Sequence, residues 1–462
     1  MNIMDHDDDD LVGANDEDNV FVEDEDNDNE EYEDVMRSLV DNDPTLTSLS
    51  VGFGGTVYPS NAIDWGSLGR AIGMNAQLIK LILCNGLPTD EHELTSFFSG
   101  LAVNRSIQTL RFEYIELNDE MIELMAPFLA DNHVFKRLEV VVNDGNEMTQ
   151  LCLVSFLLMF DYLKEFTLFH EREDNDYFDV VIQALAAHTG LKKLVLWGVS
   201  IGRRGRDSLV KLLNKSTKLK EIALANILGI TNDGWLDIFT ALQSTRCKLE
   251  KIELRGVEGV SERTALCIAA ALLHHSTTLK GLDLNQQVIV VIPLLQDPNT
   301  ILEELTLVSD NDDSITNEDI VVLTDALATN NTLKRLWLCG VHGGGYAAFT
   351  HTLCNKSSIL STYLSNHTLN MLLYARKYPL LDGSTSEELN SLLQINEENN
   401  KNQAARLKII KTHFSGNDIK MEPFTKIAVG ARPHAIAWMA KDMHFYELLR
   451  AMPSLLEKGR KD

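Results

Sequence analysis

The pattern L-x-x-L-x-L recurs through most of the chain and constrains its fold more than any other feature. A weaker first copy begins at Leu46, and we expect a degraded last copy to begin at Leu360. From Leu46 to Leu333 the successive copies begin 32, 29, 28, 28, 28, 28, 30, 30, 23 and 31 residues apart. The ten clear copies begin at Leu78, Ile107, Phe135, Leu163, Leu191, Leu219, Leu249, Leu279, Leu302 and Leu333. Such a period predicts a solenoid in which each repeat buries its leucines against its neighbours.

The segments between these copies have the apolar period of helices. In NDEMIELMAPFLADN and TNEDIVVLTDALATN the apolar residues recur at three and four positions, and both segments open with residues that cap helix N-termini. One strand and one helix in about 28 residues resembles the ribonuclease-inhibitor class of leucine-rich repeats. This resemblance implies an α/β horseshoe solenoid with parallel strands on the concave face and helices on the convex face. We also expect a small α-helical cap at its C-terminal end, because repeat arrays need closed ends.

Two departures from the repeat class lead to further expectations. Where the class carries Asn or Cys after the strand, this chain has Val199, Ile227, Val257 and Val341. This departure predicts loops anchored by apolar side chains. It leaves open whether the positions after the strands form the internal row of asparagines that is typical of the class. The short 23-residue step after Leu279 contains a proline, which would break a helix interior. It predicts a shortened convex segment with a local change in curvature, with simple erosion of the repeat as the alternative.

Charge divides the chain into three expected regions. The net charge is -27, but 17 acidic residues lie between Asp5 and Asp34, where no Lys or Arg occurs. Such a composition predicts disorder, so we expect a disordered acidic tail over 1–40, the solenoid over 41–370 and the helical cap region over 371–462. From Lys401 onward there are 12 Lys and Arg against 6 Asp and Glu. The tail is interpreted as solubilising, with masking of a basic partner or of this basic C-terminal segment as the alternative.

Strand alternation places the residues between the leucines on the concave surface, where a partner would bind. This face is predicted to be neutral, because it carries seven positive and seven negative residues. Phe169, Trp197 and Arg255 form the expected hot spot, with Trp337 as a separate contact; coverage of these rings by loops or termini is the alternative. The candidate residues are Phe169, Trp197, Lys193, Arg111, Arg137, Glu165, Glu221, Lys251, Glu253, Arg255, Asp283, Arg335 and Trp337.

Sequence motifs that suggest catalysis are interpreted as features of the repeats. Gly198 to Gly202 match G-x-S-x-G and His342 to Gly345 match an esterase oxyanion motif, but each follows a repeat strand where every repeat turns. The chain has no phosphate-binding G-x-x-x-x-G-K-[ST], no H-E-x-x-H and only isolated cysteines. The five N-x-[ST] sequons lie in expected helix-to-strand turns, where small polar residues are common. We therefore expect no enzymatic activity, no catalytic residue, no metal site and no cofactor.

The predicted function is that of a non-enzymatic scaffold. The start lacks a secretory signal, which favours a cytoplasmic protein, with the nucleus as the open alternative. We expect a monomer that binds a protein, and no small-molecule substrate, nucleic acid or membrane. The chain is also similar to an expanded set of leucine-rich-repeat proteins in diatoms and related algae, through its acidic start, its repeats and the motifs SNHTL, QAARLKIIKTHF and PHAIAWM. The alternative is a small-GTPase regulator of the Ran-activating type, a class that shares these repeats and an acidic tail, which is C-terminal there.

Overall fold

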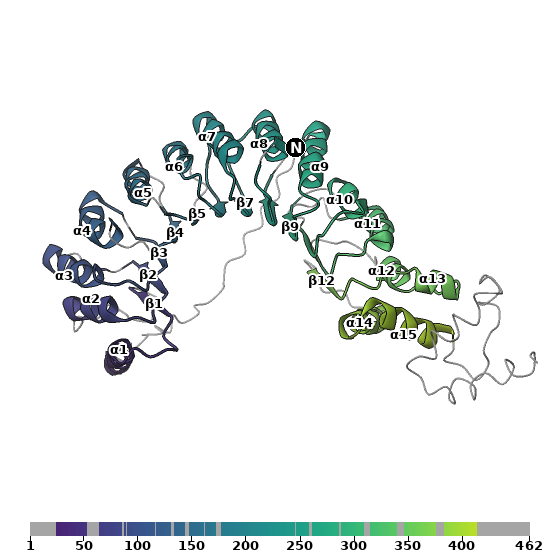
Figure 1. The fold of residues 1–462 in the computed structure, drawn as a ribbon, viewed down its shortest axis with the longest axis horizontal. Coiled ribbons are helices and arrows are strands. Elements are labelled where there is room, and N and C mark those ends of the chain that lie inside the picture. Colours follow the sequence, from purple (N-terminus) through teal and green to yellow (C-terminus); the bar gives the residue numbers. More distant parts are fainter. Residues whose placement is uncertain are drawn as a thin grey trace, which may run out of the picture.

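The strands of the chain form one continuous parallel sheet on the inner side of an arc (Figure 1). The structure is a computed structural model that describes residues 25–413, apart from 53–63, 86, 89, 116, 131–133, 144–146, 161, 172–176, 245, 258–260, 286–287, 309–314, 340–345 and 376–382. The 12 strands follow one another in sequence order from β1 to β12. They are β1 Ser48–Val51, β2 Lys80–Cys84, β3 Thr109–Glu113, β4 Arg137–Val142, β5 Glu165–His170, β6 Lys193–Trp197, β7 Glu221–Ala225, β8 Lys251–Arg255, β9 Gly281–Leu284, β10 Glu304–Val308, β11 Arg335–Cys339 and β12 Met371–Ala375.

Helices cover the outer side of this sheet, so the chain is an α/β leucine-rich-repeat solenoid, as predicted (Figure 1). Each strand from β1 to β11 is followed by at least one helix before the next strand begins. The helices are α1 Glu25–Val40, α2 Trp65–Met74, α3 Glu91–Leu101, α4 Asp119–Ala130, α5 Glu147–Met159, α6 Asp179–Leu185, α7 Arg203–Lys215, α8 Asn232–Ser244, α9 Glu262–His274, α10 Ile292–Gln296, α11 Asn317–Thr329, α12 Tyr346–Leu353, α13 Ile359–Tyr363, α14 Gly383–Glu398 and α15 Lys401–His413, with a 3-10 turn η1 Val288–Val290.

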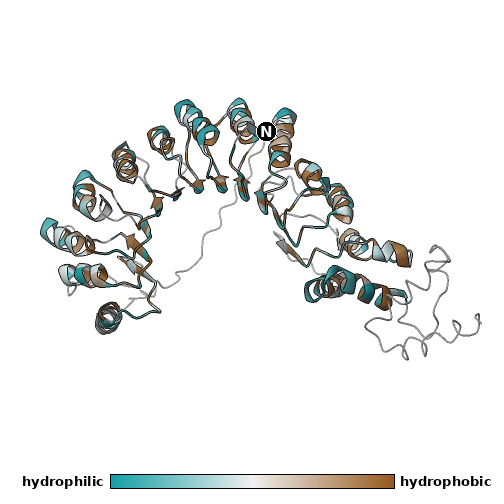
Figure 2. Ribbon diagram, viewed as in Figure 1, coloured by the Kyte–Doolittle hydropathy of each residue, from teal (hydrophilic) through white to brown (hydrophobic). Residues whose placement is uncertain are grey.

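The core is a single hydrophobic layer between the sheet and the helices. The leucines of the pattern lie at the second and fourth strand positions and just before the strand. Leu194 and Leu196 of β6, and Leu191 two residues before it, are 0% exposed. The helices turn their apolar sides toward this layer (Figure 2). Burial of a leucine side chain contributes roughly 2 kcal/mol. Because adjacent repeats supply the burying surface, this stabilisation depends on stacking.

The strand-to-loop junction has a fixed backbone geometry. The residue directly after the strand has a positive φ at Gly52, Tyr114, Gly198, Asn226 and Gly256. At Gly198 a Cβ would lie 2.0 Å from the carbonyl oxygen of His170, so the turn needs glycine there. Three of the apolar residues that follow, Val199, Ile227 and Val257, are buried and confirm the expected loop anchors, whereas Val341 lies outside the described residues.

A ladder of buried asparagines joins the repeats at the opposite edge, in the turns from helix to strand. Asn75, Asn104, Asn330 and Asn366 each lie three residues before the first apolar residue of a repeat and are at most 4% exposed. Each Nδ2 donates to a carbonyl of an earlier helix: Leu39, Ile72, Leu295 and Leu327, at 2.9, 2.8, 2.9 and 2.8 Å. The side-chain oxygens accept from two backbone N–H groups of their own turn. We call these four residues the asparagine ladder.

In another repeat a buried histidine makes the equivalent hydrogen bond to an earlier helix. His275 caps α9, is 2% exposed and has its Nε2 3.1 Å from the carbonyl oxygen of Leu242. Three of the five sequon asparagines, Asn104, Asn330 and Asn366, belong to the ladder, which supports the interpretation of the sequons as turn residues.

The expectation of disorder up to residue 40 is wrong for Glu25–Val40, which forms α1. Val35 and Leu39 are buried in the core, and Tyr32 and Met36 pack partly against it. These four residues follow the spacing of an amphipathic helix, which the acidic composition around them concealed. The helix therefore covers the first repeat, next to α2 (Figure 1).

The end of the array also differs from expectation. Leu360 lies in α13 and is 45% exposed, so no repeat begins there. The last repeat begins at Leu369, and its strand β12 pairs with β11, so the sheet continues beyond the expected boundary at residue 370. The shortened convex segment is confirmed: α10 has 5 residues, with Pro293 in its first turn, where no backbone N–H is needed.

Helices α14 and α15 follow the last strand, and residues 414–462 of the expected cap region lie outside the described residues. Lys408 of α15 is 0% exposed, and its Nζ donates to the carbonyl oxygens of Leu353 and Asn366 at 2.8 and 3.0 Å. Burial lowers the pKa of this amine to about 7. One side chain therefore fastens α15 to both α12 and the last helix-to-strand turn.

The asparagine ladder predicts a contrast between two neighbouring asparagines. Asn330→Ala should lower the free energy of unfolding by about 3 kcal/mol, because the N–H groups of Thr332 and Leu333 lose their buried acceptor. Exposed Asn331 is the matched control, and Asn331→Ala should change it by less than about 0.5 kcal/mol. Urea unfolding measures both values, and equal losses would contradict the role of the ladder.

The buried histidine predicts a specific acid sensitivity. Burial lowers the pKa of His275 to about 4, whereas a histidine in the unfolded chain has a pKa of about 6.5. Its stabilising contribution is therefore present above about pH 6.5 and is lost as the pH falls toward 4. In His275→Asn, which keeps a donor and does not titrate, the loss of unfolding free energy between pH 7.5 and 5 should be smaller by about 2 kcal/mol. An unchanged pH dependence in His275→Asn would disprove the assignment.

Candidate functional site

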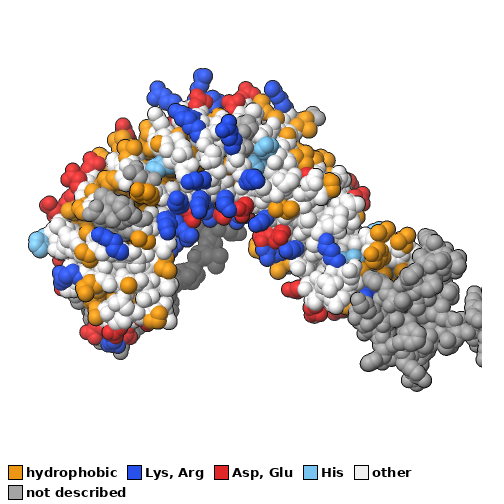
Figure 3. Space-filling view, viewed as in Figure 1, with side chains coloured by type: hydrophobic (Ala, Val, Ile, Leu, Met, Phe, Trp, Pro, Cys, Tyr) orange, Lys and Arg blue, Asp and Glu red, His pale blue; other side chains and the backbone are white. Residues whose placement is uncertain are grey.

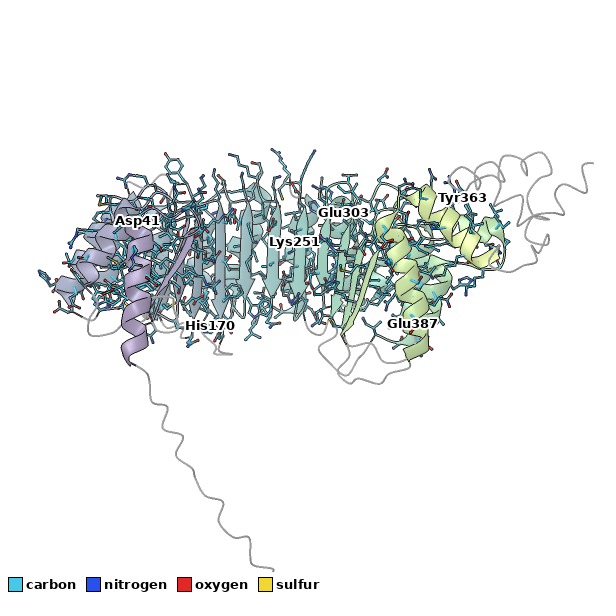
Figure 4. The ribbon with its side chains drawn as sticks, turned by 90° about the horizontal axis from the view of Figure 1, so that it is seen from below. Asp41, His170, Lys251, Glu303, Tyr363 and Glu387 are labelled. Carbon is cyan, nitrogen blue, oxygen red and sulfur yellow. The ribbon has the colours of Figure 1, made fainter. Side chains whose placement is uncertain are left out.

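All 13 candidate residues lie on strands, at positions opposite to the buried leucines. Strand pairing aligns them in three rows across the concave face, which Figure 4 shows from the open side of the arc. The first row holds the first residue of each strand, for example Arg137, Glu165, Lys193, Glu221 and Lys251. The third and fifth strand residues form the other two rows. The face expected from the sequence is therefore present as one surface.

Ion pairs within and between strands neutralise most charges on this face. Arg137 Nε lies 3.0 Å from Glu165 Oε1, and Lys193 Nζ lies 3.3 Å from Glu221 Oε2. Half-exposed pairs of this kind contribute at most about 1 kcal/mol each, so they set the charge of the surface more than its stability. The other pairs are Lys80–Glu139, Arg111–Glu139, Arg111–Glu113, Arg255–Glu253, Arg255–Asp283 and Arg335–Glu304.

An uncharged area lies between these pairs, on β5 and β6. Phe169 and Trp197 occupy equivalent positions of the two strands, and their ring centroids are 6.1 Å apart. Beside them in the third row lie Thr167 and Val195. All four side chains are half-buried, so part of each is open to solvent. We call Thr167, Phe169, Val195 and Trp197 the aromatic patch.

Arg255 closes one side of the aromatic patch. Its guanidinium carbon lies 5.9 Å from the ring centroid of Trp197, while its Nε donates to Asp283 Oδ1 at 3.0 Å. The ion pair fixes the guanidinium, and the guanidinium in turn orients the indole ring. Asp283 itself is buried at 8% exposed, so it supports the patch but is not the exposed contact expected from the sequence.

Trp337 lies far from this patch along the sheet, on β11. It is 48% exposed and pairs in register with Leu373, which is 45% exposed, next to Met371 at 38%. These three side chains form a second apolar area, the end patch. Leu373 and Met371 were missing from the candidates because the last repeat was expected to begin at Leu360. The start at Leu369 in the motif SNHTL was the signal that could have located them.

The alternative, that loops or termini cover these rings, is answered only for the described residues. Within the described residues, Phe169 and Trp197 keep solvent-open faces. Residues 1–24 and 414–462, the termini that could cover them, lie outside the described part of the chain.

The serine of the G-x-S-x-G match and the thiol of Cys84 are buried. Ser200 of the G-x-S-x-G match is 2% exposed and follows the positive-φ turn at Gly198, and His342 lies outside the described residues. Burial raises the pKa of the Cys84 thiol. Among the residues that the structure describes, no three His, Cys, Asp or Glu side chains are placed to hold a metal ion, and no helix is long and apolar enough to cross a bilayer.

Comparison with known proteins adds likenesses of fold. The leucine-rich repeat-containing protein LegL7 from Legionella pneumophila is 12% identical with a TM-score of 0.38, over 68% of this chain and 98% of that chain. A chain of the Rad7 and Elc1 complex in yeast is 14% identical with a TM-score of 0.39, over 78% of this chain and 92% of that chain. No family model and no curated protein sequence matches the chain significantly. The assignment as a leucine-rich-repeat solenoid rests on the 12 parallel strands and their buried leucines.

Proposed function

We propose that the chain is a non-enzymatic scaffold that binds another protein through the concave face, with the aromatic patch as the anchor. The observation that carries this proposal is the pair of half-open rings of Phe169 and Trp197 on a surface where most charged side chains are ion-paired. Aromatic and arginine side chains with solvent-excluding surroundings are the residues that dominate protein interfaces. The ion pairs around the patch supply such a rim.

The side chains of the concave face indicate which kind of partner segment would fit it. Because the charged neighbours are paired with each other, a partner gains little from a strong charge of either sign. An apolar or aromatic side chain that packs on Trp197, flanked by hydrogen-bonding groups, matches the patch. We propose the remaining candidates, including Lys193, Lys251 and Arg335, as the polar rim, and the end patch with Trp337 as a second contact.

Two finer proposals accompany this one. The repeats are of the ribonuclease-inhibitor type, which the helices of 11 to 13 residues in seven of the repeats support. The similarity to algal repeat proteins remains a prediction.

The scaffold is favoured over a regulator of small GTPases. An arginine that stabilises charge on a bound nucleotide has to reach it freely. Arg111, Arg137, Arg255 and Arg335 of the concave face are all held in ion pairs. A GTP-hydrolysis assay with candidate small GTPases separates the two functions, because a scaffold does not stimulate GTP hydrolysis.

Trp197→Ala tests the aromatic patch. Partner capture from a native lysate should fall at least tenfold, because a central interface tryptophan contributes about 2 kcal/mol or more. The free energy of unfolding should fall by less than about 2 kcal/mol, because the ring is only half-buried. Quantitative mass spectrometry of captured proteins and urea unfolding measure the two quantities.

Tyr162→Ala is the matched control, since this ring is 57% exposed and lies outside the concave face, in the turn before β5. It should leave capture unchanged. The proposal is wrong if Trp197→Ala strongly lowers the free energy of unfolding while the folded fraction of the variant still captures the same proteins. The aromatic patch would then stabilise the fold and not bind a partner.

A further inference from the structure

A row of lysines follows the edge of the sheet at which the strands begin. The residue directly before the strand is lysine in four successive repeats: Lys136, Lys164, Lys192 and Lys220. Their backbones continue the ladder of the sheet, because the N–H of each donates to the carbonyl of the one before, at 2.8, 2.6 and 2.8 Å. The four lysines therefore stand on adjacent rungs, about 4.8 Å apart. Figure 3 shows Lys and Arg side chains gathered along this inner rim, over the middle of the arc.

The second half of the same row is organised in the opposite way. There Glu250, Lys280, Glu303 and Lys334 alternate in sign, again on adjacent rungs. Glu250 pairs with Lys220 and Lys280, and Glu303 pairs with Lys334. The edge at which the strands begin therefore has a positively charged half, from Lys136 to Lys220, and a neutral half, from Glu250 to Lys334.

Lys136, Lys164 and Lys192 have no ion pair with any residue that the structure describes. The acidic residues next to them in the first row do not supply one, because Glu165 is paired with Arg137 and Glu221 with Lys193. Like charges on adjacent strands repel, and further exposed basic residues, Lys218, Arg246 and Lys248, lie in the nearby turns. This half of the edge has the electrostatic character of a surface that binds an extended anion.

The chain carries an anion of matching size. Residues 5–24 contain ten Asp and Glu and no Lys or Arg. At about 3.3 Å per residue these 20 residues reach up to about 66 Å. The five strand spacings from β1 to β6 cover about 24 Å, and a five-residue strand adds about 17 Å across the sheet. The segment is therefore long enough to reach Lys192.

The starting point of that segment defines its path. Figure 4 places Asp41, at the end of α1, on the same edge as Glu303, so α1 runs from there to the opposite edge, where His170 lies. The first turn of α1, which begins at Glu25, therefore lies at the edge away from the lysines. The direct route from that edge to the lysines crosses the concave side of the sheet, toward the strands β5 and β6 that carry the aromatic patch.

We propose that the acidic N-terminal segment, residues 5–24, binds in an extended form along Lys136, Lys164 and Lys192 and thereby masks the concave face of its own chain. Tethering gives the segment an effective concentration on the order of 1 mM at the row. A free acidic peptide has to displace it before it can bind. The lysine row does not depend on the partner proposed for the aromatic patch, so each proposal can fail alone.

Zero-length carbodiimide cross-linking of the full chain tests this contact, because it joins only carboxylates and amines that touch. The expected products join Asp5–Asp18 to Lys136, Lys164 and Lys192 and disappear in about 0.5 M NaCl, where the screening length is about 4 Å. Exposed Lys211 and Lys356 serve as internal controls. If mass spectrometry finds the segment joined to these two as often as to the row, the proposal is overturned.

A binding titration with a labelled 20-residue polyglutamate gives an independent readout. Replacing the acidic residues of 5–18 by Asn and Gln should tighten binding about tenfold, because the intramolecular competitor is lost. Adding Lys136→Gln, Lys164→Gln and Lys192→Gln should abolish this gain. The matched triple Arg203→Gln, Arg204→Gln and Lys211→Gln removes the same charge from exposed positions on α7 and should retain it.

Two results would overturn the proposal. The first is a polyglutamate affinity that is the same with and without the acidic residues. The second is a single-stranded oligonucleotide that binds the row equally well in both chains, which would make the row a nucleic-acid site that the segment does not occupy.

Discussion

The solenoid depends on burial that no repeat can achieve alone. Each strand turns its leucines outward from the concave face, toward a helix of the same repeat, and the neighbouring repeats close the two open sides of that layer. Leu191, Leu194 and Leu196 are completely buried for this reason. The asparagine ladder adds a second link between repeats, since each amide joins its own turn to the end of an earlier helix. Packing supplies the stability, and these hydrogen bonds fix the spacing of the rungs.

The polar surfaces follow from the same geometry. A period of about 28 residues places equivalent side chains on adjacent rungs, so any residue type that recurs in the sequence becomes a row on the surface. On the concave face the recurring charges alternate in sign and pair. On the edge at which the strands begin, four lysines recur without alternation, and the pairing starts only at Glu250. The order in which positive and negative residues follow one another at one repeat position therefore determines whether that part of the surface is neutral or positively charged.

The sequence predicts the strands well and the ends of the array poorly. From Leu78 to Leu333 the leucine pattern determines the strand positions, because a strand residue has to be apolar exactly where it faces the core. At Leu369 the preceding repeat is longer, with two helices, so the expected start at Leu360 was wrong. Tyr32, Val35, Met36 and Leu39 show helical spacing, but composition alone predicted disorder around them. The burial of Asp283 by Arg255 depends on the contact between two strands, and the pattern of single repeats does not contain it.

The fastening of α15 by Lys408 has a consequence for how the array comes apart. A linear stack usually loses order from its ends inward, because a terminal repeat has one neighbour instead of two. Here the amine of Lys408 is shared by the carbonyls of Leu353 and Asn366, so α15 cannot detach without leaving a buried group of two other elements unsatisfied. We therefore expect α15, the end of α12 and the turn at Asn366 to open together rather than one after another.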